Sequence, residues 1–212
     1  MTPEALLWAV AAGSALAYGF VFVEQPPSFL RTAVKTSAVA ALAVLAYLDG
    51  GSVLLAVALA FCALGDAFLA GDPKRWLPFG LGAFLVGHLV YIPLFLERES
   101  APSALFWPGA IAVGAAAGLM LRLLWSRLGK LRIPVVAYVL AIVGMVVSSL
   151  LLPEGRAQVA TAGAVAFMAS DAILSFDLFK GAKLLNSQRL TAWAVWFLYW
   201  GGQAAICWGM LS

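Results

Sequence analysis

Long apolar segments alternate with short polar connections along the whole chain. Eight of these segments have the length and low charge of a transmembrane helix: Ala5–Val23, Thr32–Leu48, Ser52–Gly71, Trp76–Leu96, Ala104–Leu121, Ile133–Leu152, Ala157–Phe179 and Leu190–Leu211. The connections contain helix breakers, among them Pro26-Pro27 and Pro153. Because most connections are only a few residues long, successive helices are expected to pack antiparallel as neighbours. The pattern predicts an all-α integral membrane protein with eight spans.

The composition supports a membrane location. Hydrophobic residues make up 64% of the 212 residues, and charged residues only 11%. So few polar side chains cannot cover the surface of a soluble globule of this size. Each span needs about 20 residues, so eight spans with short connections account for the chain. We therefore expect residues 1–212 to form a single membrane domain.

The distribution of Lys and Arg predicts the orientation in the membrane. Connections one, three, five and seven, with their flanks, carry Arg31, Lys35, Lys74, Arg75, Arg122, Arg127, Lys130, Arg132, Lys180, Lys183 and Arg189. The even-numbered connections carry only Arg98 and Arg156. Basic residues gather in cytoplasmic loops, so the odd-numbered connections are expected in the cytoplasm and both termini outside. The protein is expected in a membrane such as the bacterial inner membrane.

The remaining composition argues against several classes of function. The net charge of +3 comes from basic residues spread among short loops, which does not favour a nucleic-acid partner. His88 is the single histidine, and Cys62 and Cys207 lie in apolar segments without a Cys-x-x-Cys spacing. These residues lack the ligand set of a zinc site, so we expect neither a metal nor a cofactor. The cysteines are expected to be packing residues.

Asp66 and Asp171 are polar positions that the hydrophobic pattern does not explain. An ionised aspartate inside a bilayer costs several kcal/mol unless it is paired, hydrated or neutral. At about 1.5 Å per helical residue, they lie about 8 and 12 Å from the cytoplasmic ends of their spans. Intramembrane carboxylates commonly mark a site or a pathway. The alternative is a structural polar network that fixes the helix register.

Other polar residues of the spans are expected around a central cavity in the cytoplasmic half: Lys35, His88, Tyr91, Tyr138, Ser170, Tyr199 and Gln203. Lys35 lies near enough to the interface that it can instead extend its ammonium group to water. Tyr199 and Gln203 are one helical turn apart and are expected to face inward. They serve either as ligand contacts or as ordinary interhelical hydrogen bonds.

The two aspartates lie in similar short segments. GDAFL around Asp66 resembles SDAIL around Asp171, and each aspartate is followed six positions later by another, Asp72 and Asp177. A parallel repeat of four plus four spans would bring the two aspartates face to face across a central cavity. Chance similarity between short apolar strings is the alternative explanation.

Four segments in order resemble the YhhN-like lysoplasmalogenase family of multi-span membrane hydrolases. They are FCALGDAFL around Asp66, FGLGAFLVGHLVYIPLF around His88, GAVAFMASDAIL around Asp171, and the pair Tyr199 and Gln203. The resemblance extends over essentially the whole chain in length, number of spans and order of motifs. It departs at Lys35, which is followed by Thr36 where the family often has a Lys-Pro pair.

The resemblance implies hydrolysis of the vinyl ether bond of lysoplasmalogens to a fatty aldehyde and a glycerophospho-alcohol. This chemistry begins with a proton delivered to carbon, and water then captures the oxocarbenium-like cation. It needs one protonated carboxylic acid and one carboxylate, the division of labour used on glycosides. Asp66 and Asp171 are expected to supply them, and the sequence leaves open which is the acid. The phosphate headgroup of the lysophospholipid would meet the basic loops, with its chain among membrane lipids and spans.

Two other functions remain open at this point. Paired membrane carboxylates also occur in proton-coupled transporters, although no span is clearly broken in its middle. A lipid-binding membrane protein without turnover would keep the cavity and make the aspartates structural. The sequence does not indicate the headgroup, the chain length, the physiological substrate or the oligomeric state.

Overall fold

The computed structural model describes residues 2–50 and 52–211, and this part of the chain contains helices and no strands. The long helices are α1 (Pro3–Ala17), α2 (Phe29–Leu48), α3 (Val53–Ala70), α4 (Pro73–Leu96), α5 (Phe106–Leu124), α6 (Arg132–Ser149), α7 (Gln158–Lys180) and α8 (Gln188–Met210). A π-helical turn, η1 (Tyr18–Phe22), extends α1, and short 3-10 turns, η2 (Gly129–Leu131) and η3 (Leu184–Asn186), precede α6 and α8. The eight predicted helices are present, with ends within a few residues of the predicted ones.

Short polar side chains mark where several helices begin. The hydroxyl groups of Thr2, Ser28, Ser52 and Ser187 each accept a hydrogen bond from a backbone N–H in the first turn of α1, α2, α3 and α8. Such caps satisfy donors that have no partner within the helix. Gly181 ends α7 with a φ of 64°, a left-handed conformation that glycine adopts without strain.

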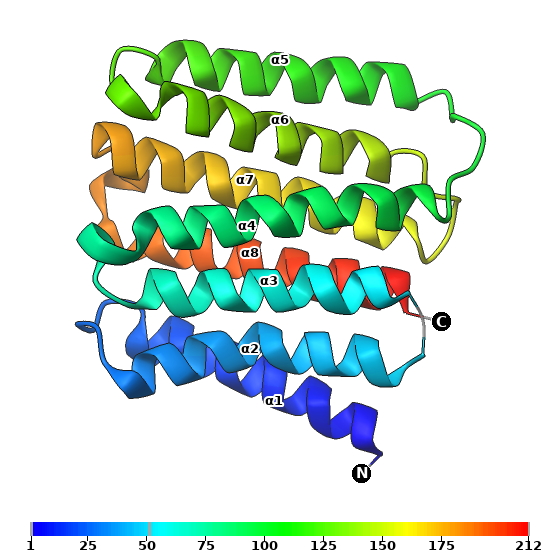
Figure 1. The fold of residues 1–212 in the computed structure, drawn as a ribbon, viewed down its shortest axis with the longest axis horizontal. Helices are drawn as coiled ribbons and strands as arrows, with labels where there is room; N and C mark the ends of the chain where they lie inside the picture. The colour runs from blue at the N-terminus through cyan, green and yellow to red at the C-terminus, as the bar shows by residue number, and fades with distance from the viewer. Residues whose placement is uncertain (1, 51, 212) are drawn as a thin grey trace.

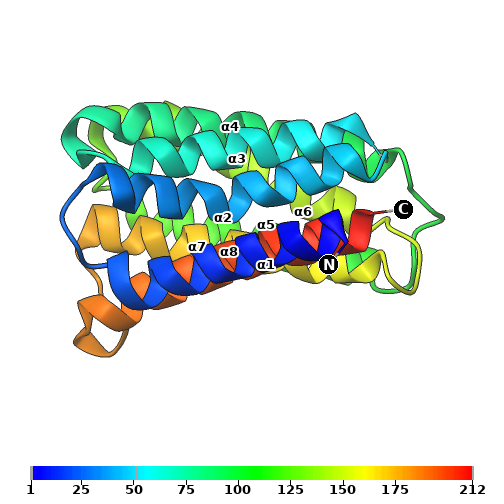
Figure 2. The same ribbon diagram turned by 90° about the horizontal axis from the view of Figure 1, so that it is seen from below.

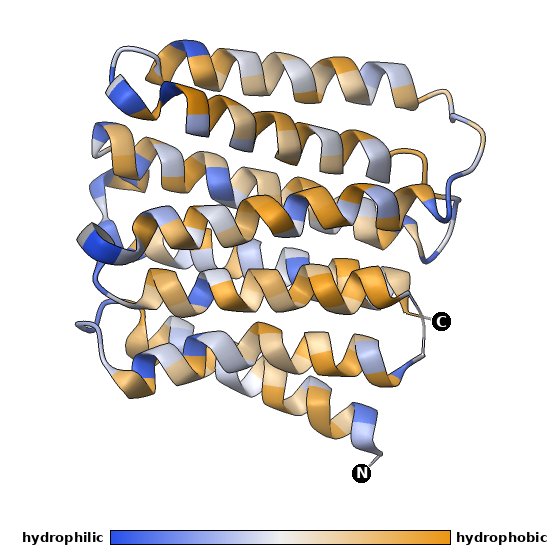
Figure 3. Cartoon of the chain, viewed as in Figure 1, coloured by the Kyte–Doolittle hydropathy of each residue, from blue (hydrophilic) through white to orange (hydrophobic). Residues whose placement is uncertain are grey.

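The structure is that of an all-α integral membrane protein. Seven helical segments, from α1 with η1 to α7, are long and apolar enough to cross a membrane. α8 falls outside this set because its Trp, Tyr, Gly and Gln residues lower its mean hydropathy, yet it has 23 residues and packs along α7. A helix of that length extends about 34 Å, enough for a bilayer core. Hydrophobic residues dominate the helices, and hydrophilic ones gather near their ends (Figure 3).

The helices form one bundle in which sequence neighbours pack antiparallel, except α4 and α5, which have no extensive contact among the described residues. α1 packs on α2, α2 on α3, α3 on α4, and likewise α5 on α6, α6 on α7 and α7 on α8. The two halves of the chain meet where α4 packs on α6 and α2 packs on α8 (Figures 1 and 2). Both ends of the chain lie at the right of Figure 1, at the opposite end of the bundle from the odd-numbered connections. We call the latter the basic end.

Matched positions in the two halves follow the predicted repeat. Lys35 in α2 and Tyr138 in α6 are each the seventh residue of their helix. Phe84 in α4 and Tyr199 in α8 are each the twelfth. The contact of α4 with α6 and that of α2 with α8 are the pair that a two-fold relation between α1–α4 and α5–α8 produces.

Two glycines bring the backbones of α7 and α8 into direct contact. A Cβ atom added to Gly163 would lie 2.5 Å from the carbonyl oxygen of Gly202. A Cβ atom added to Gly202 would lie 2.7 Å from the carbonyl oxygen of Gly163. Neither position accepts a side chain without separating the helices, so these glycines fix how α7 sits along α8.

Candidate active site

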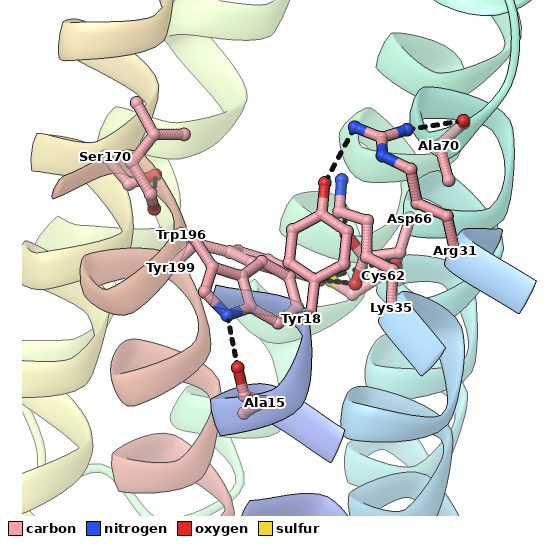
Figure 4. A network of polar contacts seen from close by, with 11 residues as sticks. Ala15, Tyr18, Arg31, Lys35, Cys62, Asp66, Ala70, Ser170, Trp196 and Tyr199 are labelled. Atoms are coloured by element: carbon pink, nitrogen blue, oxygen red, sulfur yellow. Dashed lines mark hydrogen bonds and ion pairs between the residues drawn. The ribbon is translucent and has the colours of Figure 1, made fainter. Parts of the chain in front are cut away.

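Asp66 lies at the meeting point of α2, α3 and α8. Its side chain is 1% exposed and forms an ion pair with Lys35, whose Nζ lies 3.2 Å from Oδ1. The Tyr199 hydroxyl donates a hydrogen bond of 2.7 Å to the other carboxyl oxygen. Figure 4 shows these three side chains together. The structure thus gives Asp66 a cationic partner and a neutral hydrogen-bond donor.

Lys35 does not extend to water. Its side chain is only 11% exposed, and its ammonium group lies 5.6 and 5.7 Å from the ring centres of Tyr18 and Trp196. A cation held among aromatic faces and one carboxylate is shielded from solvent. Lys35 is therefore part of the buried site, although its position near the start of α2 also permitted a place at the interface.

Asp171 has a different set of partners. The Tyr138 hydroxyl of α6 donates a hydrogen bond of 2.7 Å to its Oδ2. Nε2 of His88 in α4 lies 3.8 Å from the same oxygen, too far for a hydrogen bond. The Asp171 side chain is 16% exposed, so it is the more accessible of the two carboxyl groups.

His88 is fully buried beside Asp171. Its ring centre lies 5.0 Å from that of Tyr138 and 4.6 Å from that of Phe167. In the described part of the chain, no side chain forms a hydrogen bond with either ring nitrogen. A buried imidazole in this position is stabilised when a water or a ligand supplies such a bond.

A cavity of about 330 Å³ joins the two aspartates. Six of the nine predicted site residues line it: Lys35, Asp66, Tyr138, Ser170, Asp171 and Tyr199. Its wall also includes Arg31, Asp177 and Gln188, which lie at or near the basic end of the bundle. The Ser170 hydroxyl donates a hydrogen bond of 2.8 Å to the Val195 carbonyl, which ties α7 to α8 beside the cavity. We call this space the polar cavity.

Tyr91 and Gln203 lie away from the polar cavity. The Tyr91 hydroxyl donates a hydrogen bond to Oε1 of Gln203, and Nε2 of Gln203 lies 3.4 Å from the Cys62 sulfur. All three side chains are buried, and none of them lines the cavity. Tyr199 and Gln203 both face inward as predicted, and both contact Cys62, but only Tyr199 contacts an aspartate.

Comparison with known proteins identifies the family. The sequence model of the YhhN family matches residues 30–210. The chain belongs to the YhhN family. The lysoplasmalogenases of Mycobacterium bovis and Mycobacterium tuberculosis are each 34% identical to it over 211 residues, which cover 91% of this chain and 78% of the relative. The uncharacterized membrane protein YhhN of Escherichia coli O157:H7 is 31% identical over 91 residues, 43% of this chain and 42% of the relative. No solved structure matches.

Arg31 lines the polar cavity of this YhhN-family chain. The sequence pattern had indicated only that it belongs to the basic residues of a cytoplasmic connection. Its guanidinium donates to the Phe22 carbonyl at 3.1 Å. It also donates to the Ala70 carbonyl at 2.6 Å and the Tyr18 hydroxyl at 3.0 Å (Figure 4). These contacts tie the ends of η1 and α3 to α2. Arg31 precedes Lys35 by one helical turn, and this spacing on one helix face was the signal available in the sequence.

Proposed function

We propose that this chain is a lysoplasmalogenase that hydrolyses the vinyl ether bond of alkenyl lysophospholipids with two aspartates in separate roles. The observation that carries this proposal is a single cavity lined by the carboxyl groups of Asp66 and Asp171, which have unlike partners. The two mycobacterial relatives named lysoplasmalogenase, which align with 91% of this chain, support the same reaction. The family resemblance of the motifs around Asp66, His88 and Asp171 agrees with it.

Asp66 is the carboxylate in this proposal. The Lys35 ammonium at 3.2 Å stabilises the ionised form in a buried site, where opposite charges attract more strongly than in water. The Tyr199 hydroxyl donates to the same group and favours the anion further. A fixed negative charge at this place stabilises the oxocarbenium-like cation that forms after protonation.

Asp171 is the proton donor. In the described part of the chain, no lysine or arginine forms an ion pair with it, and a buried carboxyl group without a cation is least costly when neutral. Its greater exposure to the cavity lets it reach a substrate. The Tyr138 hydroxyl at 2.7 Å orients the carboxyl group.

The reaction then follows from these two roles. The Asp171 proton goes to the alkenyl carbon that is not bonded to the ether oxygen, and the double-bond electrons form the new C–H bond. Water adds to the other alkenyl carbon and loses a proton to the Asp171 carboxylate. The hydroxyl group of the resulting hemiacetal loses its proton and forms the C=O bond while the bond to the glycerol oxygen breaks. The glycerol oxygen takes up one proton in exchange, and a fatty aldehyde and a glycerophospho-alcohol leave.

Basic residues support a phosphate headgroup on the same side as the polar cavity. Arg31 and Lys35 lie in the cavity wall, and the other basic residues of the odd-numbered connections surround the basic end. Their excess over the even-numbered connections supports a cytoplasmic location for this end, with both termini outside. A lysophospholipid would then hold its phosphate near Arg31 and its vinyl ether deeper in the bundle.

The direct test is aldehyde release by the purified protein in detergent, without any ion gradient. An alkenyl lysophospholipid is expected to give aldehyde, and a lysophospholipid with an ester-linked chain is expected to give none. Asp66→Asn and Asp171→Asn should abolish the activity, with unfolding temperatures and gel-filtration profiles like those of the wild type. Full activity in both variants would refute the assignment. Uptake of the lipid into proteoliposomes that needs a pH gradient, with no aldehyde formed, would identify a transporter instead.

A further inference from the structure

A second cavity of about 600 Å³ lies between α4, α5, α6 and α7. Its wall is almost entirely apolar, with Leu, Val, Ala, Met, Pro and Phe side chains from all four helices. Its charged or hydroxyl-bearing residues are Tyr138, Asp171 and Ser175. We call it the apolar cavity. A space of this chemistry accepts a hydrocarbon chain rather than a headgroup.

The apolar cavity meets the polar cavity at the proposed acid. Asp171 and Tyr138 line both, together with Leu77, Leu81, Leu174 and Leu178. A lysophospholipid has its vinyl ether at the junction between its polar headgroup and its apolar chain. The boundary between headgroup and chain in the lipid thus corresponds to the boundary between the polar and the apolar cavity. The vinyl ether bond then lies beside the residues that line both cavities.

The apolar cavity is open toward the side of the bundle. α5 packs on α6 and α7, but it has no extensive contact with α4 among the described residues. Gly82 of α4 and Ala112 and Ala116 of α5 line the cavity and are exposed. In a membrane this α4–α5 seam faces lipid, so a chain can pass through it without crossing water.

The matching seam in the other half is closed. Gly82 is the tenth residue of α4, and the tenth residue of α8 is Phe197. A Cβ atom on Gly19 of η1 would lie 2.4 Å from the Phe197 ring, so α1 and α8 are in tight contact there. The Trp193 and Trp196 indole N–H groups add hydrogen bonds of 2.7 and 2.9 Å to carbonyls of η1 and α1. Of these two seams, the α4–α5 seam is the one with a glycine at this position, and the apolar cavity lies behind it.

We propose that the alkenyl chain of the substrate enters from the membrane between α4 and α5 and occupies the apolar cavity. This places its vinyl ether bond against Asp171 and Tyr138, and it makes Gly82 a residue that determines which chains fit. The proposal rests on the proposed function for the identity of the lipid. The existence of a chain-binding cavity can be tested separately from hydrolysis.

Substitution of Gly82 tests the chain site by activity. A Cβ atom there meets nothing within 4 Å, so Gly82→Leu extends into the cavity without a clash at its base. We expect kcat/KM for a long-chain alkenyl lysophospholipid to fall at least about tenfold, with little change for an analogue whose chain has only a few carbons. Ala116→Phe, which narrows the cavity from α5, should act the same way. Gly114→Leu is the matched control, because Gly114 also faces open space but lies outside the cavity wall.

A lysophospholipid with a photoreactive group at the end of its chain tests the same site without turnover. In Asp171→Asn protein, cross-links are expected on the residues of α4, α5, α6 and α7 that line the apolar cavity, and they should be lost in the Gly82→Leu double variant. Cross-links on α1, α2, α3 or α8, or equal activity of Gly82→Leu and Gly114→Leu toward the long chain, would overturn the proposal. If the wild type releases no aldehyde but the cross-links persist, the proposed reaction is wrong and the chain site stands.

Discussion

Asp66 and Asp171 occupy comparable places in the two halves of the bundle, yet their surroundings differ in charge. Asp66 receives an ion pair from the seventh residue of α2, Lys35, and Asp171 receives a hydrogen bond from the seventh residue of α6, Tyr138. The opposite half adds one more group to each, Tyr199 of α8 to Asp66 and His88 of α4 to Asp171.

This comparison shows how a nearly symmetric framework can give two like groups opposite roles. A buried ammonium beside one carboxyl group favours its ionised form, and a phenol beside the other adds no charge. The helix positions can therefore stay equivalent and the chemistry can still divide into an acid and a carboxylate. The following substitutions change the two aspartates, then their partners and, last, a buried contact outside the polar cavity.

The largest effect is expected from the aspartates themselves. Asp171→Asn and Asp66→Asn should each lower kcat by about 1,000-fold or more, because an acid or a charge that acts in the transition state is lost. The two variants should differ in pH dependence. The residual rate of Asp171→Asn should rise about tenfold for each unit that the pH falls, as hydronium replaces the missing acid. A steeper rise in Asp66→Asn than in Asp171→Asn would reverse the assignment.

Loss of the Lys35 charge should be the next largest effect. Lys35→Met leaves the Asp66 carboxylate buried without a cation, which is expected to lower stability by about 3 kcal/mol and kcat by about 100-fold. Thermal unfolding in detergent and the aldehyde assay measure the two effects. Adding Asp66→Asn to Lys35→Met should recover stability but not activity. Recovery of neither would show that Lys35 does not act through Asp66.

Tyr138→Phe should have a smaller effect. It removes one hydrogen bond to Asp171 and keeps the ring that packs on His88. A loss of about 1.4 kcal/mol in the transition state lowers kcat about tenfold. KM should change little, because the hydroxyl orients the acid rather than the lipid. An effect confined to KM would instead place Tyr138 in substrate binding.

The smallest effect on activity is expected at Tyr91. Tyr91→Phe breaks the buried hydrogen bond to Gln203, which should cost about 1 kcal/mol of stability. Because neither residue lines the polar cavity, kcat/KM should stay close to that of the wild type. A tenfold loss of activity in a protein that unfolds only slightly earlier would show that this pair does contribute to the reaction.

The sequence predicted the helices well because apolar length is a local property. The eight apolar segments appear as α1 with η1 and α2–α8, and the charges between them lie at the helix ends. The π-helical turn η1 was not predicted, because an apolar segment has the same hydropathy pattern whether one turn of it is α-helical or π-helical.

Six of the nine predicted site residues line the polar cavity, but the sequence did not predict which of them contact one another. The free-energy cost of a charge inside the membrane singled out Asp66 and Asp171. Similar distances from the cytoplasmic ends of the helices then added Lys35, Tyr138 and Tyr199. Depth alone could not separate Tyr199, which contacts Asp66, from Gln203, which contacts Tyr91, because the two lie one turn apart. The apolar cavity has no signal in the local sequence either, because it depends on the distance between α4 and α5 in the folded bundle.

The glycine contact between α7 and α8 makes the two aspartate surroundings mechanically dependent on each other. Asp171 lies on α7 beside His88, and Tyr199 lies on α8 beside Asp66. Gly163 and Gly202 join these two helices backbone to backbone. A shift of α8 along α7 would therefore move the Tyr199 hydroxyl relative to Asp171. The contact of Gly163 with Gly202 therefore helps to fix where Tyr199, the hydrogen-bond partner of Asp66, lies relative to Asp171, although it touches neither carboxyl group.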